Sequence, residues 1–290
     1  MRIPHWIKQG SRGCADSTPL NAVRPGSVGS RRLHTVCEEA RCPNRPLCFQ
    51  KPTATFLILG NACTRSCGFC AVQHGLTYQP DINEPIAIAE AAAEMGLRHV
   101  VVTSVTRDDL PDGGASHFAE TVRCIRQYLP GSTVELLIPD FKGDDAALQT
   151  VLASGPDILN HNVETVSRLY PTVRPQADYA RSLRLLKTAK DHAPSAKTKS
   201  GLMVGLGETF DEVRQVLQDL RGVSCDAVTI GQYLMPTKKH LPVVEYIHPA
   251  VFESLRKEAS SLGFRFVAAG PLVRSSMNAE RLFDEPLKAL

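Results

Sequence analysis

The chain has 290 residues, of which 43% are hydrophobic and 22% are charged, with a formal net charge of +3. It is too long for a disulfide miniprotein and long enough to bury one large core. The charge is too small to indicate a nucleic-acid partner, and no apolar run approaches the roughly 20 residues of a membrane span. The first residues lack the apolar core of a secretory signal, so we expect a protein of the reducing cytoplasm, without nucleic acid or membrane partners.

After about fifty proline-rich residues, the sequence alternates regularly between strand and helix patterns. Apolar runs of β-branched residues predict strands, and segments of 3.6-residue periodicity predict helices. In chain order, the expected strands are 53–60, 99–105, 133–139, 158–164, 198–206 and 227–234. The expected helices, one after each strand, are 84–96, 116–129, 144–155, 178–192, 209–222 and 249–263.

The six strand–helix units predict a parallel sheet. Because a standard barrel closes with eight units, we expect an α/β fold of the partial (β/α)6 TIM-like barrel class, with a flat doubly wound sheet as the alternative. The chain ends are too short to bury cores of their own. We therefore expect an N-terminal extension over 1–52, the barrel over 53–263, and a C-terminal strand and tail over 264–290, with both extensions packed on the barrel.

Six of the nine cysteines lie between residues 37 and 70. Cys63, Cys67 and Cys70 form a C-x3-C-x2-C set directly after the first strand, where parallel βα folds gather their active sites. Structural zinc normally takes four protein ligands, and the residues between these cysteines offer no fourth soft ligand. Three thiolates suit an iron–sulfur cluster with one open iron; a structural zinc or an electron-transfer site is the alternative.

This triad, after the first strand of a partial (β/α)6 barrel, resembles the radical S-adenosylmethionine superfamily. The resemblance implies that Cys63, Cys67 and Cys70 hold a [4Fe–4S] cluster whose open iron binds S-adenosyl-L-methionine. Reductive cleavage of that molecule yields a 5′-deoxyadenosyl radical, which removes hydrogen from an unactivated carbon. The cofactors carry this chemistry, while the protein directs it and excludes water.

A second triad lies upstream, where Cys37, Cys42 and Cys48 form C-x4-C-x5-C. It matches the auxiliary-cluster motif of the lipoyl synthases, and the chain is identified as a member of that family by its resemblance from about residue 33 to about 280. The matching segments are RDDLPDGGA (107–115), NHNVETV (160–166), VRPQADY (173–179), SGLMVGLGET (200–209), GQYL (231–234) and GPLVRSS (270–276).

The resemblance implies a sulfurtransferase that inserts two sulfur atoms, at C6 and C8 of an octanoyl chain amide-linked to a lysine. The carriers are lipoyl domains, as in 2-oxoacid dehydrogenase E2 subunits and the glycine cleavage H protein. The implied cofactors are two [4Fe–4S] clusters and S-adenosyl-L-methionine. One cluster generates radicals, the auxiliary cluster donates sulfur, and an electron donor such as ferredoxin or flavodoxin supplies the electron.

The auxiliary triad supplies three thiolates, and the resemblance points to Ser276 as its fourth ligand and as a residue of the catalytic chemistry. Serine oxygen is a harder and less usual partner for iron than thiolate, so an iron held this way should leave more readily. The family pattern is R-S-S-Y, whereas this chain has Met277 after Ser276. The ligand is therefore present, but the tyrosine ring is not.

Four polar residues near strand ends are candidates for S-adenosylmethionine contacts: Thr103, Asn160, Glu164 and Arg174. Arg174 could pair bidentately with the carboxylate of the cofactor. Each of the four could equally be an ordinary polar residue at a strand end. The segment GLMVGLGE (201–208) resembles the superfamily element that packs against adenine.

The remaining features have structural interpretations. Cys124 and Cys225 are expected to be buried apolar-like thiols, and Cys14 has no partner set. Four lysines are expected to be exposed: Lys197, Lys199, Lys238 and Lys239. Two other functions stay open: an RNA methylthiolating enzyme, which should carry an extra RNA-binding domain, and an iron–sulfur carrier or scaffold, which would not need the barrel.

Overall fold

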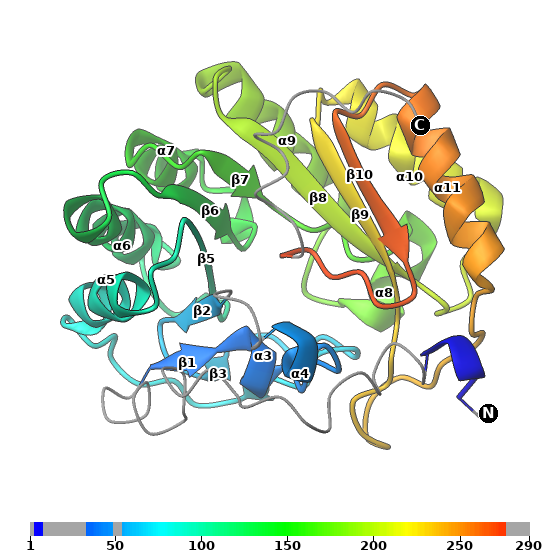
Figure 1. Cartoon of the computed structure of the whole chain (residues 1–290), viewed down its shortest axis with the longest axis horizontal. Helices are drawn as coiled ribbons and strands as arrows, with labels where there is room; N and C mark the ends of the chain where they lie inside the picture. Colours follow the sequence, from blue (N-terminus) through cyan, green and yellow to red (C-terminus); the bar gives the residue numbers. More distant parts are fainter. Residues whose placement is uncertain (1–2, 8–32, 49–53, 277–290) are drawn as a thin grey trace. The chain divides into compact units, whose positions relative to one another are not determined.

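The computed structural model describes residues 3–7, 33–48 and 54–276 (Figure 1). The chain divides into two compact units, named here the N-terminal unit and the C-terminal unit. The N-terminal unit consists of Ser11–Ser66 and Ala71–Ile158, and the C-terminal unit of Met1–Gly10, Cys67–Cys70 and Leu159–Leu290. The residues from Cys63 to Cys70 are thus shared between the two.

The N-terminal unit contains three parallel strands in the order in which they occur in the chain. They are β2 (Thr55–Ile58), β5 (His99–Ser104) and β6 (Thr133–Leu137). The following helices are α5 (Glu84–Glu94), α6 (Ala115–Tyr128) and α7 (Asp145–Ala153), which lie along one side of these strands in Figure 1. Their buried positions include Ile88, Phe118, Val122 and Val151. These strands therefore present their carboxyl ends at one edge.

Short elements surround the cysteines of this unit. The strand β1 (His34–Thr35) pairs antiparallel with β2, and β3 (Ala62–Cys63) pairs with β4 (Gln73–His74). The helices α3 (Val36–Glu39) and α4 (Arg45–Cys48) follow β1. The turn η2 (Phe141–Gly143) follows β6. The sequence, which shows little periodicity in residues 33–48, did not predict these elements.

The C-terminal unit repeats the same parallel pattern. Its strands β8 (Lys197–Val204), β9 (Ala227–Gln232) and β10 (Phe266–Gly270) are parallel neighbours in that order. Its helices are α9 (Tyr179–His192), α10 (Phe210–Gly222) and α11 (Pro249–Ser261), and its short helices are η3 (Ser167–Leu169) and α8 (Tyr170–Val173). The strand β7 (Ile158–Asn160) lies where the two units divide.

Helix α10 shows how sequence produces this packing. Thr209 accepts from the Glu212 N–H and Glu212 accepts from the Thr209 N–H, which forms a capping box at the helix start. Its buried residues, Val213, Val216, Leu217 and Leu220, recur at the spacing of one helix face. This face packs in one core with Leu202 and Val204 of β8, Val228 and Ile230 of β9, and Phe252 and Leu255 of α11.

All of the predicted strands and helices are present in the predicted order. The largest difference concerns the strand expected over 158–164, since β7 ends at Asn160. Residues 161–163 leave the regular ladder, and Glu164, with φ 65°, pairs with β8 again only through an isolated parallel bridge to Leu202. The strand-like run after the last helix is confirmed as β10. The division of the chain at 52 and 263 stays a prediction, and Cys14 lies outside the described residues.

The expected exposure of Lys199 is wrong. This residue is 0% exposed, whereas Lys238 and Lys239 are exposed as expected and Lys197 is half-buried. The reason is that β8 is buried along almost its whole length, as parallel strands covered on both faces are. Among the described residues, none of the helices has the length and hydropathy needed to cross a membrane.

Candidate functional site

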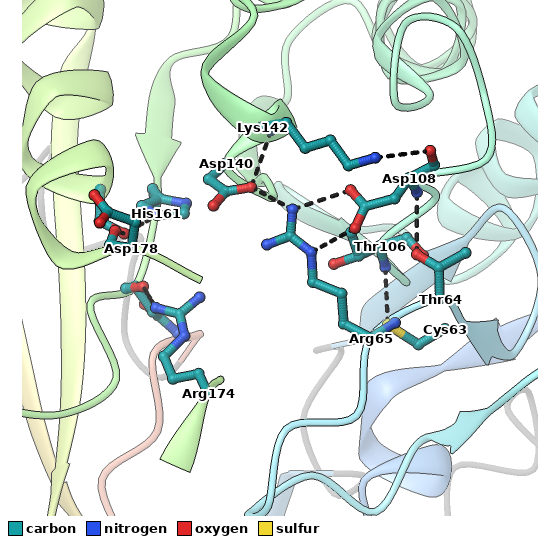
Figure 2. Close-up of polar contacts among 12 residues, drawn as sticks. Cys63, Thr64, Arg65, Thr106, Asp108, Asp140, Lys142, His161, Arg174 and Asp178 are labelled. Atoms are coloured by element: carbon teal, nitrogen blue, oxygen red, sulfur yellow. Dashed lines mark hydrogen bonds and ion pairs between the residues drawn. The ribbon is translucent and has the colours of Figure 1, made fainter. Parts of the chain in front are cut away.

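The backbone just after β2 and β5 positions Cys63. Its Sγ accepts hydrogen bonds from the Arg65 N–H at 3.4 Å and the Thr106 N–H at 3.3 Å. The neighbouring Thr64 bonds to the same segment, because its N–H and its hydroxyl both donate to the Thr106 carbonyl, at 3.0 and 2.9 Å. The Asp108 N–H donates in turn to Thr64 Oγ1 at 3.0 Å. Figure 2 shows the Cys63 sulfur facing the Thr106 amide.

Arg65 lies between two carboxylates that come from different strand ends (Figure 2). It pairs bidentately with Asp108, through Nε at 2.7 Å and Nη2 at 3.0 Å, and Nη2 also reaches Asp140 at 2.7 Å. Burial alone would lower the pKa of Arg65, but the hydrogen bonds to both aspartates outweigh it and raise the pKa. Arg65 and Asp140 are 6% and 1% exposed, and removal of one partner of such a buried pair costs roughly 3–5 kcal/mol.

A second group of contacts fixes the chain before Cys63. Leu59 has φ 67°, a strained conformation for a branched side chain. Its N–H donates to Glu84 Oε2 at 2.8 Å, and its carbonyl accepts from Arg107 Nη1 at 3.3 Å. Arg107, which is 2% exposed, also pairs with both oxygens of Asp109. The hydrogen bond from Arg107 lowers the pKa of Asp109 to about 2.

Asp109 also accepts from Thr77 Oγ1 at 2.8 Å. The consecutive residues 107–109 of the motif RDDLPDGGA therefore bond to the chain on both sides of Cys63, at Leu59 before it and at Thr64, Arg65 and Thr77 after it.

Cys67 and Cys70 belong to the C-terminal unit, where the loops after β7 and β9 hold them. The Gly68 N–H donates to the Val173 carbonyl at 2.9 Å, and the Leu241 N–H donates to the Gly68 carbonyl at 3.0 Å. The Cys70 carbonyl lies 2.9 Å from His240 Nε2. Because a carbonyl only accepts, His240 must carry its proton on Nε2 here.

The thiols of this triad have the donor chemistry of a cluster site. All cysteines in the described part of the chain are free thiols, and Cys63, Cys67 and Cys70 are half-buried. Within that same part, no three His, Cys, Asp or Glu side chains are grouped so that they could hold a metal ion. An iron–sulfur cluster places each thiolate on a different iron, so its ligands need not surround a single ion.

The upstream triad forms a local group in the N-terminal unit. Cys37 lies in α3, which Thr35 caps by accepting from the Glu38 N–H at 3.3 Å, and Cys48 ends α4. The Cys42 N–H donates to the Cys37 carbonyl at 3.1 Å. Burial raises the pKa of Cys37 to about 11, and negative charge on Cys42 and Cys48 raises it further. The three thiols are thus close enough to interact electrostatically, and iron binding would displace a proton from Cys37.

Ser276, the last described residue, follows β10 and is half-buried. The loop before it lies against β9, because the Gln232 N–H donates to the Pro271 carbonyl at 3.4 Å. A Cβ at Gly231 would lie 2.3 Å from the Val273 carbonyl oxygen, so only glycine allows this approach. The motif GQYL therefore contacts the loop that leads to Ser276, through Gly231 and Gln232. Met277 lies outside the described residues.

The four expected cofactor contacts are divided between the two units. Thr103 belongs to the N-terminal unit and donates its hydroxyl to the Leu137 carbonyl at 2.9 Å. Asn160, Glu164 and Arg174 belong to the C-terminal unit. Burial raises the pKa of Glu164, and the charge of Arg174 opposes that rise. Arg174 Nη1 donates to the carbonyls of Asn162 and Val163, at 2.9 and 3.2 Å.

Asn162 is a further candidate that the sequence reasoning missed. It is 9% exposed, and its Oδ1 has no hydrogen-bond partner within the described ranges. A Cβ at Gly201 would lie 2.8 Å from this oxygen and 2.7 Å from Thr229 Oγ1. The two oxygens and the bare glycine form a small polar cradle. In the sequence, Asn162 is the second asparagine of NHNVETV and lies between Asn160 and Glu164.

Comparisons with known proteins identify the family and the fold of the chain. Residues 57–220 match the family model of the radical SAM superfamily. The structure is similar to Streptococcus suis SuiB bound to S-adenosylmethionine, with a TM-score of 0.57, 10% identity, and coverage of 73% of this chain and 49% of that one. It is also similar to methylornithine synthase, with a TM-score of 0.55, 15% identity, and coverage of 98% and 91%.

The chain is therefore a radical S-adenosylmethionine enzyme with the partial (β/α)6 barrel fold of that superfamily, as expected, and the flat doubly wound alternative is wrong. Such enzymes use S-adenosylmethionine and a [4Fe–4S] cluster.

Its relatives narrow the class further. The lipoyl synthase of Alkaliphilus metalliredigens is 54% identical over 284 residues, which cover 98% of this chain and 97% of that protein. The lipoyl synthase of Caldicellulosiruptor saccharolyticus is 60% identical over 248 residues, which cover 86% and 87%. The chain belongs to the lipoyl synthase family, a family of sulfurtransferases. The scaffold and RNA-modifying alternatives are thereby excluded.

Proposed function

We infer that the chain inserts two sulfur atoms, at C6 and C8 of an octanoyl group amide-linked to a lysine of a lipoyl carrier domain. The observation that carries this function is the presence of two separate thiol triads in this chain, which matches a lipoyl synthase over 98% of its own length. Two triads suit the reaction because it needs both a radical generator and a source of sulfur.

Cys63, Cys67 and Cys70 are the proposed ligands of the barrel cluster. With S-adenosylmethionine, that cluster supplies the one-electron chemistry that activates the substrate C–H bonds. The contribution of the chain is to fix the thiolates and the cofactor. The two N–H donors at the Cys63 sulfur would stabilise the negative charge that a reduced cluster carries.

Thr103, Asn160, Glu164 and Arg174 are the proposed contacts of S-adenosylmethionine, and Asn162 is added to them. The partnerless Oδ1 of Asn162, which lies beside the bare Gly201, fits a ligand group that donates a hydrogen bond. Arg174 Nη1 is already bonded to two carbonyls. A bidentate grip on the cofactor carboxylate would therefore use Nε and Nη2.

Cys37, Cys42 and Cys48, with Ser276, are the proposed ligands of a second, auxiliary cluster that gives up its sulfur. The proposal draws on the family motif and on the electrostatic coupling among the three thiols. The proposed partners are octanoylated carrier domains of 2-oxoacid dehydrogenase E2 subunits or the glycine cleavage H protein, and an electron donor such as ferredoxin or flavodoxin. The cytoplasm is the proposed location, since the described cysteines are all free thiols.

The function is tested by anaerobic reconstitution with iron and sulfide, followed by reaction with an octanoylated carrier domain, a reductant and S-adenosylmethionine. We expect the intact mass of the carrier to change by the replacement of two hydrogens with two sulfurs. An unmodified carrier, in a preparation that cleaves S-adenosylmethionine, would contradict the proposed function. A non-octanoylated carrier is the matched control, because it presents the same protein surface without the reactive chain.

Ser276 gives a sharper prediction. In Ser276→Ala we expect iron to be retained but most of the lipoyl product to be lost, with 5′-deoxyadenosine formation affected less. In Ser276→Cys we expect the cluster to bind at least as tightly and to donate sulfur poorly, because thiolate is the better iron ligand. Product mass and iron content measure both effects. Ser275→Ala is the matched control, and equal product from Ser276→Ala and Ser275→Ala would remove Ser276 from the ligand set.

A further inference from the structure

We propose that Arg65, Arg107, Asp108, Asp109 and Asp140 form a clamp that holds the Cys63 sulfur against the backbone N–H of Thr106. Neither the family comparison nor the ligand assignment gives these five residues a role. That Cys63 is a cluster ligand rests on the proposed function, whereas the clamp itself is a set of contacts within the N-terminal unit.

The clamp begins with three consecutive side chains after β5. Arg107 bonds to the Leu59 carbonyl before Cys63, at 3.3 Å. Asp108 accepts two hydrogen bonds from Arg65, two residues after Cys63. Asp109 accepts from Thr77 beyond it. Three successive residues of one segment therefore fix three separate points of the chain around this cysteine.

Asp140 connects the clamp to the next strand. It is 1% exposed, it follows β6, and it accepts from Arg65 Nη2 at 2.7 Å and from the Lys142 N–H at 3.1 Å. Lys142 also donates through Nζ to the Asp108 carbonyl at 3.2 Å. One guanidinium thus joins the ends of β5 and β6. A lysine could neutralise the charge, but it lacks the planar fork needed to bond to both carboxylates.

The clamp determines whether the Cys63 sulfur keeps both of its N–H donors, because the two donors come from different parts of the chain. The Arg65 N–H reaches Cys63 Sγ within the same turn, so it needs no distant support. The Thr106 N–H comes from 43 residues away and stays at 3.3 Å only while the two segments are held together. Hydrogen bonds to cluster sulfurs raise the reduction potential. Loosening the clamp should therefore make the barrel cluster harder to reduce.

The test compares Asp108→Asn with Asp157→Asn. Both aspartates belong to the N-terminal unit and pair with an arginine, and their side chains are 20% and 29% exposed. Asp157, however, bonds to Arg126 and to the Val134 N–H, and it contacts none of the clamp residues in those bonds. Arg65→Lys is the second test variant, because it keeps the charge that Asp140 needs and removes the fork.

The first readout is amide hydrogen exchange of the full chain, with and without reconstituted clusters. In Asp108→Asn and Arg65→Lys we expect the peptides over 59–66 and 104–110 to exchange about tenfold faster, as expected when a charge-assisted bond that limits local opening is lost. Asp157→Asn should leave these peptides unchanged. Unchanged exchange in the two clamp variants, or equal acceleration in Asp157→Asn, would overturn the proposal.

The second readout is the reduction potential of the barrel cluster, followed by electron paramagnetic resonance in a chain that also carries Cys37→Ala, Cys42→Ala and Cys48→Ala. We expect a shift to lower potential in Asp108→Asn and none in Asp157→Asn. Faster exchange with an unchanged potential would overturn the link to the sulfur. Failure of the wild-type chain to assemble a cluster would instead refute the proposed function, and the exchange data would still decide on the clamp.

Discussion

Simultaneous replacement of Cys63, Cys67 and Cys70 by alanine is expected to abolish the cleavage of S-adenosylmethionine and to leave iron for one cluster per chain. The reason is that the thiolate is the iron ligand, and a methyl group cannot replace it. All three thiols are half-buried rather than part of the core, so their removal should leave the folded chain intact. Iron and sulfide content, together with 5′-deoxyadenosine formation, measure the outcome.

Cys124→Ala is the matched control for this variant, since Cys124 is buried in α6 and belongs to neither triad. It should keep both clusters and full cleavage activity. The prediction assumes two clusters in the wild-type chain. Iron that saturates near one cluster in anaerobic wild-type protein would contradict it, as would cleavage of S-adenosylmethionine by the triple variant.

The sequence was enough to predict the order of strands and helices, because that order depends on local patterns. The apolar residues of α10 recur at Val213, Val216, Leu217 and Leu220, and this spacing is visible without any tertiary contact. The exposure of Lys199 was predicted wrongly for the opposite reason. Lys199 lies on the opposite face of β8 from Leu202 and Val204, which pack with α10 and α11, so its burial depends on tertiary contacts that a local pattern does not show.

In the candidate site, too, the local features could be predicted from the sequence and the non-local contacts could not. The cysteine triads are local in sequence, so their spacing could be recognised. The contacts around Cys63 are not local, since Arg65 meets Asp140 across 75 residues and Thr106 meets Cys63 across 43. The segment RDDLPDGGA contains Asp108, but the local sequence does not show that Asp108 pairs with Arg65. The unpaired Oδ1 of Asn162 likewise depends on where β7 ends, which the strand pattern placed four residues too late.

Simultaneous replacement of Cys37, Cys42 and Cys48 by alanine is expected to have the complementary effect, in which 5′-deoxyadenosine still forms but no lipoyl product appears. The hydrogen bonds that fix Cys63, Thr64 and Arg65 come from residues 106, 108 and 140. The upstream thiols lie in a different segment, with Cys37 in α3 and Cys48 in α4. Radical generation should therefore survive their loss.

The two activities are separated by assaying one reaction mixture for both products, 5′-deoxyadenosine by chromatography and the carrier by intact mass. The wild-type chain should give both, and the upstream variant only the first. Cys225→Ala is the matched control, because this thiol is 0% exposed and its pKa is raised to about 12 by burial, so it is not available as a ligand. If the upstream variant still produced the lipoyl group in normal yield, sulfur would have to come from elsewhere, and the second triad would lose its proposed role. If it failed to form 5′-deoxyadenosine as well, the two sites would not be independent, and the hydrogen bonds around Cys63 would be insufficient to hold that part of the chain without the upstream segment.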